Sequence, residues 1–175
     1  MKLSDQYKLK NYDTDKNTVH SYIDYLYNDL FISGYADVLE IGAFNGGSAL
    51  LWQDYFINAN IDVIDITECQ AIKNQPRINH IVGNAYSDDM LKNLRQYDLI
   101  IDDGPHTLDS MIFFVNHYTK LLKSNGICII EDIQDVMWFN TLISIIPTDC
   151  FYYAVDLRNV KNRYDDLVLV IRKIR

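Results

Sequence analysis

The sequence is poor in the residues that build disulfide frameworks, flexible linkers and membrane anchors. It contains three cysteines, three prolines and seven glycines in 175 residues. Cys69, Cys128 and Cys150 are odd in number and widely spaced, which indicates neither a disulfide framework nor a zinc site. No window approaches the ~20 apolar residues of a membrane-spanning helix, and the polar N-terminus has no apolar signal core. We therefore expect a soluble, cytoplasmic protein.

Positive charge is also scarce. Lysine and arginine together number 16, against 24 aspartates and glutamates, which gives a net charge of -8. Non-specific binding to nucleic acid or to an anionic membrane needs a basic surface, so this balance argues against both. A small molecule or a sugar is the expected partner, and a homo-oligomer stays open.

Apolar runs alternate with helix-compatible segments along a chain whose length suits one domain. Within residues 1–175, an N-terminal segment and helix are expected in 1–33 and the core in 34–175. The predicted strands are 36–41, 60–65, 78–82, 97–102, 126–131, 150–156 and 166–172. The predicted helices are 17–32, capped by Asn17, then 46–57, 87–95, 108–122 and 134–145. This alternation predicts an α/β fold with a mostly parallel sheet, and the short polar link between the last two strands predicts an antiparallel hairpin.

Two predicted strands end in pairs of carboxylates. Asp102 and Asp103 follow one buried run, and Glu131 and Asp132 follow the next. Because ligands of open α/β sheets bind beyond the carboxyl ends of the strands, we expect the two pairs to be neighbours. Crowded carboxylates repel one another unless one is protonated or a cation lies among them. The pattern therefore predicts a metal or proton-transfer site, to which His106 adds a group that titrates near neutral pH.

A glycine-containing turn follows the first predicted strand of the core. Gly42 and Gly46 would let the backbone approach a ligand closely at a helix N-terminus. Their spacing is not G-x-G-x-x-G, so the dinucleotide-binding fingerprint is absent. Asp65 ends the second strand, where an acidic side chain accepts hydrogen bonds from ribose hydroxyls in nucleotide-binding folds. The alternatives are a simple strand-to-helix turn and a local capping residue.

These features together resemble class I S-adenosylmethionine-dependent methyltransferases. The resemblance lies in the Glu40-x-Gly42-x-x-x-Gly46 turn, in Asp65 and in the strand 97–102. More narrowly, the Asp-Asp-Gly-Pro-His of 102–106 and the Glu-Asp-Ile of 131–133 resemble the metal-dependent sugar O-methyltransferases of macrolide biosynthesis. The Tyr-Asp-Thr-Asp-Lys of 12–16, with His20 and Tyr22, is similar to the segment before the core in that family.

The resemblance spans residues 12 to about 133 and includes two departures. Pro105 replaces the serine that is usual in that family, and Asn84 stands where many methyltransferases have an acidic residue near the adenine.

The resemblance implies a Rossmann-like methyltransferase fold, with a mostly parallel seven-stranded sheet, an antiparallel C-terminal hairpin and helices on both faces. It also implies O-methylation of a sugar or glycosylated small molecule by S-adenosylmethionine, with Mg²⁺ or Mn²⁺ bound by Asp103, Glu131 and Asp132 and with His106 as the base. Three oxygen ligands suit such a hard ion independently. The implied cofactor-binding residues are Glu40, Gly42, Ala43, Asn45, Gly46, Asp65, Asn84, Ala85 and Asp102.

Other interpretations stay open at this point. His106 could be a surface histidine in a turn, and Glu131-Asp132 could cap the following helix. Asp15, Lys16 and His20 fit a solvated helix face as well as a cofactor lid. The alternative functions are a cephalosporin-hydroxylase-like enzyme or a phenolic O-methyltransferase on the same scaffold, or a non-catalytic cofactor-binding subunit.

Overall fold

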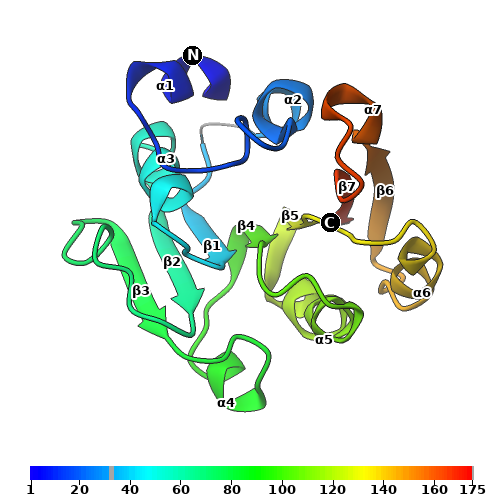
Figure 1. Cartoon of the computed structure of the whole chain (residues 1–175). Helices are drawn as coiled ribbons and strands as arrows, with labels where there is room; N and C mark the ends of the chain where they lie inside the picture. The colour runs from blue at the N-terminus through cyan, green and yellow to red at the C-terminus, as the bar shows by residue number, and fades with distance from the viewer. Residues whose placement is uncertain (32–33, 175) are drawn as a thin grey trace.

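Seven strands form one sheet in the order β3-β2-β1-β4-β5-β7-β6 in the computed structural model, which describes residues 1–31 and 34–174 (Figure 1). β1 to β5 pair in parallel, whereas β7 runs antiparallel to both β5 and β6. All seven predicted strands and the C-terminal hairpin are confirmed. β5 begins earlier than predicted. The strands are β1 (Asp37–Ile41), β2 (Asn60–Asp65), β3 (Ile78–Val82), β4 (Tyr97–Asp102), β5 (Leu122–Ile130), β6 (Cys150–Asp156) and β7 (Leu167–Lys173).

Helices cover both faces of this sheet, as predicted. Successive strand residues face opposite sides, so Val38 packs in the core that contains Trp52, whereas Leu39 packs in the core that contains Phe114. The first core includes α1 (Leu3–Leu9), η1 (Ile23–Tyr27), α2 (Asn28–Leu30) and α3 (Gly47–Tyr55). The second includes α4 (Asp88–Leu91), α5 (Leu108–Tyr118), η2 (Thr119–Leu121) and α6 (Trp138–Ser144), and α7 (Arg158–Lys161) lies between β6 and β7. Within the described part of the chain, no helix is long and apolar enough to cross a membrane.

The N-terminal segment differs from its prediction. The predicted helix over 17–32 is wrong in its first part, and its end at residue 32 lies outside the described residues. The backbone turns at Asp15, whose carbonyl accepts from the amides of Thr18, Val19 and His20, and helical structure begins only at η1, a single π-type turn. Val19 is 41% exposed, although it is apolar, whereas the charged Lys16 is only 1% exposed. The tertiary contacts of Lys16 therefore override the local helical pattern.

Candidate functional site

A pocket of about 580 Å³ lies at the carboxyl ends of the parallel strands. Its walls come from the turn after β1, the end of β2, the loops after β3 and β4, and the N-terminal residues 13–15. This is the sheet edge at which open α/β folds bind ligands. The predicted site residues that line it are Gly42, Ala43, Asp65, Asn84, Ala85, Asp103, His106 and Asp132.

Gly42 brings the turn after β1 against the loop after β4. Its φ of 95° lies in the left-handed region, and a Cβ at this position would lie 2.0 Å from the carbonyl oxygen of Asp103. Only glycine fits both the conformation and the contact. This contact fixes the turn after β1 beside Asp103, one of the carboxylates that line the pocket.

Asp65 lines the pocket where β2 ends. Its Oδ2 accepts from the amide of Ala43 at 2.8 Å, and its Oδ1 accepts from the amide of Thr67 at 2.8 Å. Burial alone would raise the pKa of Asp65, but these donors outweigh it and hold the pKa below its ordinary value. The side chain is therefore an ionised acceptor at the pocket wall.

Glu40, one of the predicted cofactor-binding residues, is buried behind the pocket rather than on its lining. Its Oε2 accepts from Ser48 Oγ at 2.9 Å and from Trp52 Nε1 at 3.0 Å, so the carboxylate is turned toward α3. Three other predicted cofactor-binding residues also lie outside the pocket lining: Asp102 accepts from the Tyr86 hydroxyl, Asn45 donates to Asp13, and Gly46 packs against Ile72. Their contacts with a cofactor stay predictions.

The buried position of Glu40 predicts a pH-dependent effect of Glu40→Gln. Burial raises the pKa of Glu40 from 4.5 to about 7, although Lys16 opposes this rise. Ionisation of Glu40 therefore destabilises the folded state as the pH rises through that window, and glutamine removes this cost while keeping an acceptor oxygen. The variant's free energy of unfolding minus that of wild type should therefore increase by on the order of 1 kcal/mol when the pH is raised from about 5 to about 8. Urea denaturation at both pH values measures it, and a difference that is independent of pH would contradict it.

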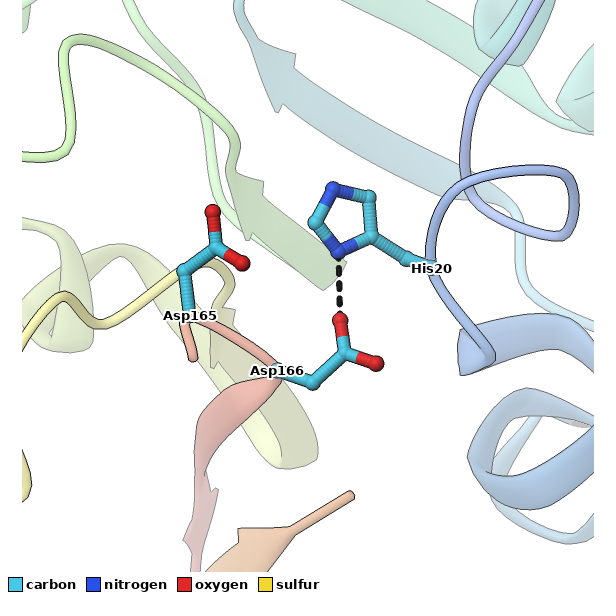
Figure 2. Close-up of side chains that lie close together, drawn as sticks. All are labelled: His20, Asp165 and Asp166. Atoms are coloured by element: carbon cyan, nitrogen blue, oxygen red, sulfur yellow. Dashed lines mark hydrogen bonds and ion pairs between the residues drawn. The ribbon is translucent and has the colours of Figure 1, made fainter. Parts of the chain in front are cut away.

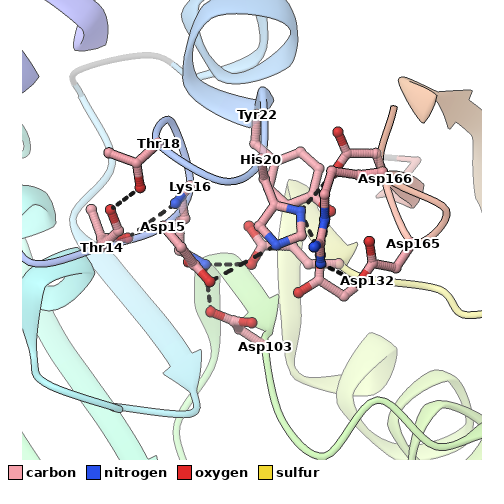
Figure 3. A network of polar contacts seen from close by, with 12 residues as sticks. Thr14, Asp15, Lys16, Thr18, His20, Tyr22, Asp103, Asp132, Asp165 and Asp166 are labelled. Carbon is pink, nitrogen blue, oxygen red and sulfur yellow. Dashed lines mark hydrogen bonds and ion pairs between the residues drawn. The ribbon is translucent and has the colours of Figure 1, made fainter. Parts of the chain in front are cut away.

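Lys16 brings the N-terminal segment into contact with the acidic end of the pocket (Figure 3). Its Nζ lies 2.6 Å from Asp103 Oδ2 and 3.6 Å from Glu40 Oε1, and it also donates to Glu131 Oε2. Burial opposes the charged form, but the three carboxylates raise the pKa of Lys16 well above its ordinary value. The segment that the sequence left open as a helix face or a lid is thus tied to the site by a buried ammonium group.

His20 makes a second link between the N-terminal segment and the carboxylates. Its Nδ1 lies 2.5 Å from Asp166 Oδ1 and 3.3 Å from Asp132 Oδ1. Figure 2 shows the imidazole directed at Asp166. Burial opposes protonation of His20, but Asp132, Asp166 and Asp15 outweigh it and raise the pKa of the imidazole. The nearby Asp165 forms an ion pair with Arg163 at 2.8 Å. Asp165 and Asp166 therefore each have a basic side chain of the protein as a partner.

Asp103, His106 and Asp132 converge from the loops after β4 and β5. His106 Nε2 lies 3.8 Å from Asp103 Oδ1 and 3.7 Å from Asp132 Oδ2. One candidate ligand atom from each of the three lies within 4.8 Å of the others. Both His106 and Asp132 have a φ of 53°, a conformation uncommon outside glycine that is often found at functional sites. The prediction that the two acidic pairs are neighbours is confirmed.

Several polar side chains of the site had no prediction from the sequence. Tyr22 donates to Asp132 Oδ1, Tyr27 donates to Glu131 Oε1, and Tyr86 donates to Asp102. The resemblance around residues 12–22 pointed to the segment that contains Tyr22. For Tyr27 and Tyr86 the sequence contains no local signal, since their acceptors lie 104 and 16 residues away.

Comparisons with known proteins agree with this geometry. No family model matches the chain. A rhamnosyl tetracenomycin-C 2'-O-methyltransferase of Streptomyces olivaceus is 25% identical over 114 residues, which are 63% of this chain and 29% of that protein. MycE, a methyltransferase of the mycinamycin biosynthetic pathway solved with Mg and S-adenosylhomocysteine, superposes on the whole chain with a TM-score of 0.78 at 20% identity. The chain covers 55% of that structure.

The fold is shared with methyltransferases that differ in acceptor. The N-methyltransferase NodS of Bradyrhizobium japonicum matches 81% of the chain, and 88% of its own length, with a TM-score of 0.59 at 16% identity. The fold is therefore shared with a protein named as an N-methyltransferase as well as with MycE, so the fold does not define the acceptor, which must be argued from the site. The chain has the Rossmann-like fold of S-adenosylmethionine-dependent methyltransferases and resembles the sugar O-methyltransferases among them.

Proposed function

We propose that this protein is a Mg²⁺-dependent O-methyltransferase that transfers a methyl group from S-adenosylmethionine to a hydroxyl of a sugar or glycosylated small molecule. The observation that carries this proposal is a single pocket that is lined by Gly42 and Asp65 and also by Asp103, His106 and Asp132. The Streptomyces olivaceus relative, named for 2'-O-methylation of a rhamnosyl tetracenomycin, and MycE, solved with Mg, S-adenosylhomocysteine and mycinamycin VI, support the acceptor class. A cytoplasmic location, where the donor is made, belongs to the same proposal.

The pocket residues fit both implied groups. The left-handed backbone at Gly42 and the ionised Asp65 suit a donor with an amino-acid part and a ribose. Among the described residues, the cluster of Asp103, His106 and Asp132 offers carboxylate oxygens beside an imidazole and contains no thiol. Such a set of donors suits a hard divalent cation. When bound, the cation lowers the pKa of a hydroxyl that it contacts, and S-adenosylmethionine supplies the electrophilic methyl group.

The chain's own residues would then act by position and proton transfer. Asp103 and Asp132 would hold the cation, and the His106 imidazole beside them would accept the proton of the acceptor hydroxyl. Residues 13–15 close one side of the pocket and would limit the entry of water. Alignment of the hydroxyl with the methyl group is the remaining contribution, which is one of proximity and orientation.

Transfer of a labelled methyl group tests this function. Purified protein is incubated with methyl-labelled S-adenosylmethionine, Mg²⁺ and a panel of glycosylated and phenolic acceptors, with and without a chelator. Label should appear on a sugar hydroxyl and should be lost on chelation. Label on phenols alone would favour the phenolic alternative, and full transfer after exhaustive chelation would refute the metal requirement.

Asp65→Ala should weaken binding of S-adenosylhomocysteine. The substitution removes an ionised acceptor at the place proposed for the ribose, where each hydrogen bond contributes roughly 1 kcal/mol or more. Calorimetry should therefore show an affinity reduced about tenfold or more. Glu68→Ala is the matched control, because Glu68 is half-exposed and follows Thr67, the last lining residue of this loop. Equal affinity losses in the two variants would contradict the role given to Asp65.

A further inference from the structure

Glu131 is engaged at both of its carboxylate oxygens. Oε2 accepts from the Lys16 ammonium and Oε1 accepts from the Tyr27 hydroxyl, and all three side chains are buried. A divalent cation at either oxygen would have to share that oxygen with one of these buried donors, and Glu131 is not among the residues that line the pocket. At Oε2 the cation would also lie beside the Lys16 ammonium, and the repulsion between two positive charges is strong in a site of low dielectric.

Asp103 and Asp132 differ from Glu131 in this respect. Asp103 uses Oδ2 for Lys16 and turns Oδ1 toward His106, whereas Asp132 uses Oδ1 for Tyr22 and His20 and turns Oδ2 toward His106. Each aspartate thus has one oxygen held by the N-terminal segment and one oxygen directed at the same imidazole. Both aspartates line the pocket, while Glu131 lies behind them.

We propose that Lys16 is a positioning residue that withholds Glu131 from the metal site, so that the cation is held by the two aspartates alone. This inference rests on the proposed function and changes the ligand set that the sequence resemblance implied. Lys16 is a fixed protein cation that lies beside the carboxyl groups of Glu131 and Glu40 and fixes the orientation of Asp103. Mg²⁺ is commonly held by one or two carboxylates, with its other positions left to water and substrate.

Mn²⁺ binding to the purified protein tests this ligand set without an acceptor. The free Mn²⁺ signal in electron paramagnetic resonance gives the affinity of wild type, Glu131→Gln and Asp132→Asn, two variants that replace neighbouring carboxylates by amides of equal size. Glu131→Gln should keep the Mn²⁺ affinity within about threefold, whereas Asp132→Asn should lose about tenfold or more. An equal loss in the two variants, or no Mn²⁺ binding to wild type, would overturn the inference.

Lys16→Met separates the proposed role from a purely structural one. Loss of the ammonium removes a repelling charge and releases Oε2 of Glu131 and Oδ2 of Asp103, so the Mn²⁺ affinity should increase several-fold. Lys16→Arg keeps the charge and should leave the affinity near that of wild type. Weaker Mn²⁺ binding in Lys16→Met, or an unchanged affinity, would overturn the inference. If Lys16→Met does not fold, the comparison of Glu131→Gln with Asp132→Asn decides alone.

Binding of S-adenosylhomocysteine to the same samples distinguishes this inference from the proposed function. If that ligand binds wild type while Glu131→Gln loses Mn²⁺ as Asp132→Asn does, the assigned ligand set is wrong and the methyltransferase proposal stands. If wild type binds no S-adenosylhomocysteine, the proposed function itself fails, whatever the Mn²⁺ titrations show.

Discussion

His106→Ala is expected to lower kcat by about 10²–10⁴-fold, the usual contribution of a positioned general base. His106 Nε2 is within 4 Å of one carboxylate oxygen each of Asp103 and Asp132, and it lies on the pocket wall. A sugar hydroxyl is a weak nucleophile, so loss of the proton acceptor should affect the chemical step. The affinity for S-adenosylhomocysteine should change little, because the imidazole is assigned to the acceptor end of the pocket.

His117→Ala is the matched control for this prediction. His117 lies on α5, stacks on Phe113 and is separate from the residues that line the pocket. Wild-type kcat with the true acceptor in His106→Ala, together with an unchanged pH profile, would show that the imidazole is structural. The cation alone would then have to activate the hydroxyl.

Asp103→Asn is expected to lower the rate of methyl transfer by at least about 100-fold and to abolish its dependence on Mg²⁺. A bound cation contributes several kcal/mol of charge stabilisation, and about 1.4 kcal/mol corresponds to a tenfold change in rate. The amide cannot replace the carboxyl oxygen of Asp103 that faces His106. Residual activity should no longer respond to a chelator. Initial rates over a range of Mg²⁺ concentrations measure this effect.

The neighbouring Asp102→Asn is the matched control, with the same chemical change one residue earlier. Asp102 accepts from Tyr86 on the other side of the strand end, and asparagine can keep that bond through its amide oxygen. Its effect on Mg²⁺ dependence should be much smaller. Equal losses in the two variants would mean that the carboxylates act through the loop and not through a cation.

The sheet could be predicted because its central strands contain short apolar runs. The segments around Val38, Leu99 and Ile127 are buried on both faces and are mostly apolar, and their order along the chain follows the β-α alternation. The turn at Gly42 and the placement of the acidic pairs at one sheet edge follow from the same topology. These features depend on local sequence and on the general rules of parallel sheets.

The N-terminal segment could not be predicted in the same way. Lys16 is buried because it pairs with carboxylates 87 and 115 residues away, and His20 because it pairs with Asp166. A polar residue with no apolar periodicity is normally solvated, and only the tertiary position of its partners reverses this expectation. For the same reason, the sequence could pair Glu131 with Asp132 but could not separate their roles.

Calorimetric titration with S-adenosylhomocysteine tests the central claim most directly, because it requires neither the true acceptor nor the metal. We expect saturable binding to the wild-type pocket, no displacement by NAD, and an affinity reduced about tenfold or more in Asp65→Ala. Tight binding of NAD with no binding of S-adenosylhomocysteine would contradict the assignment of this pocket to a methyl donor.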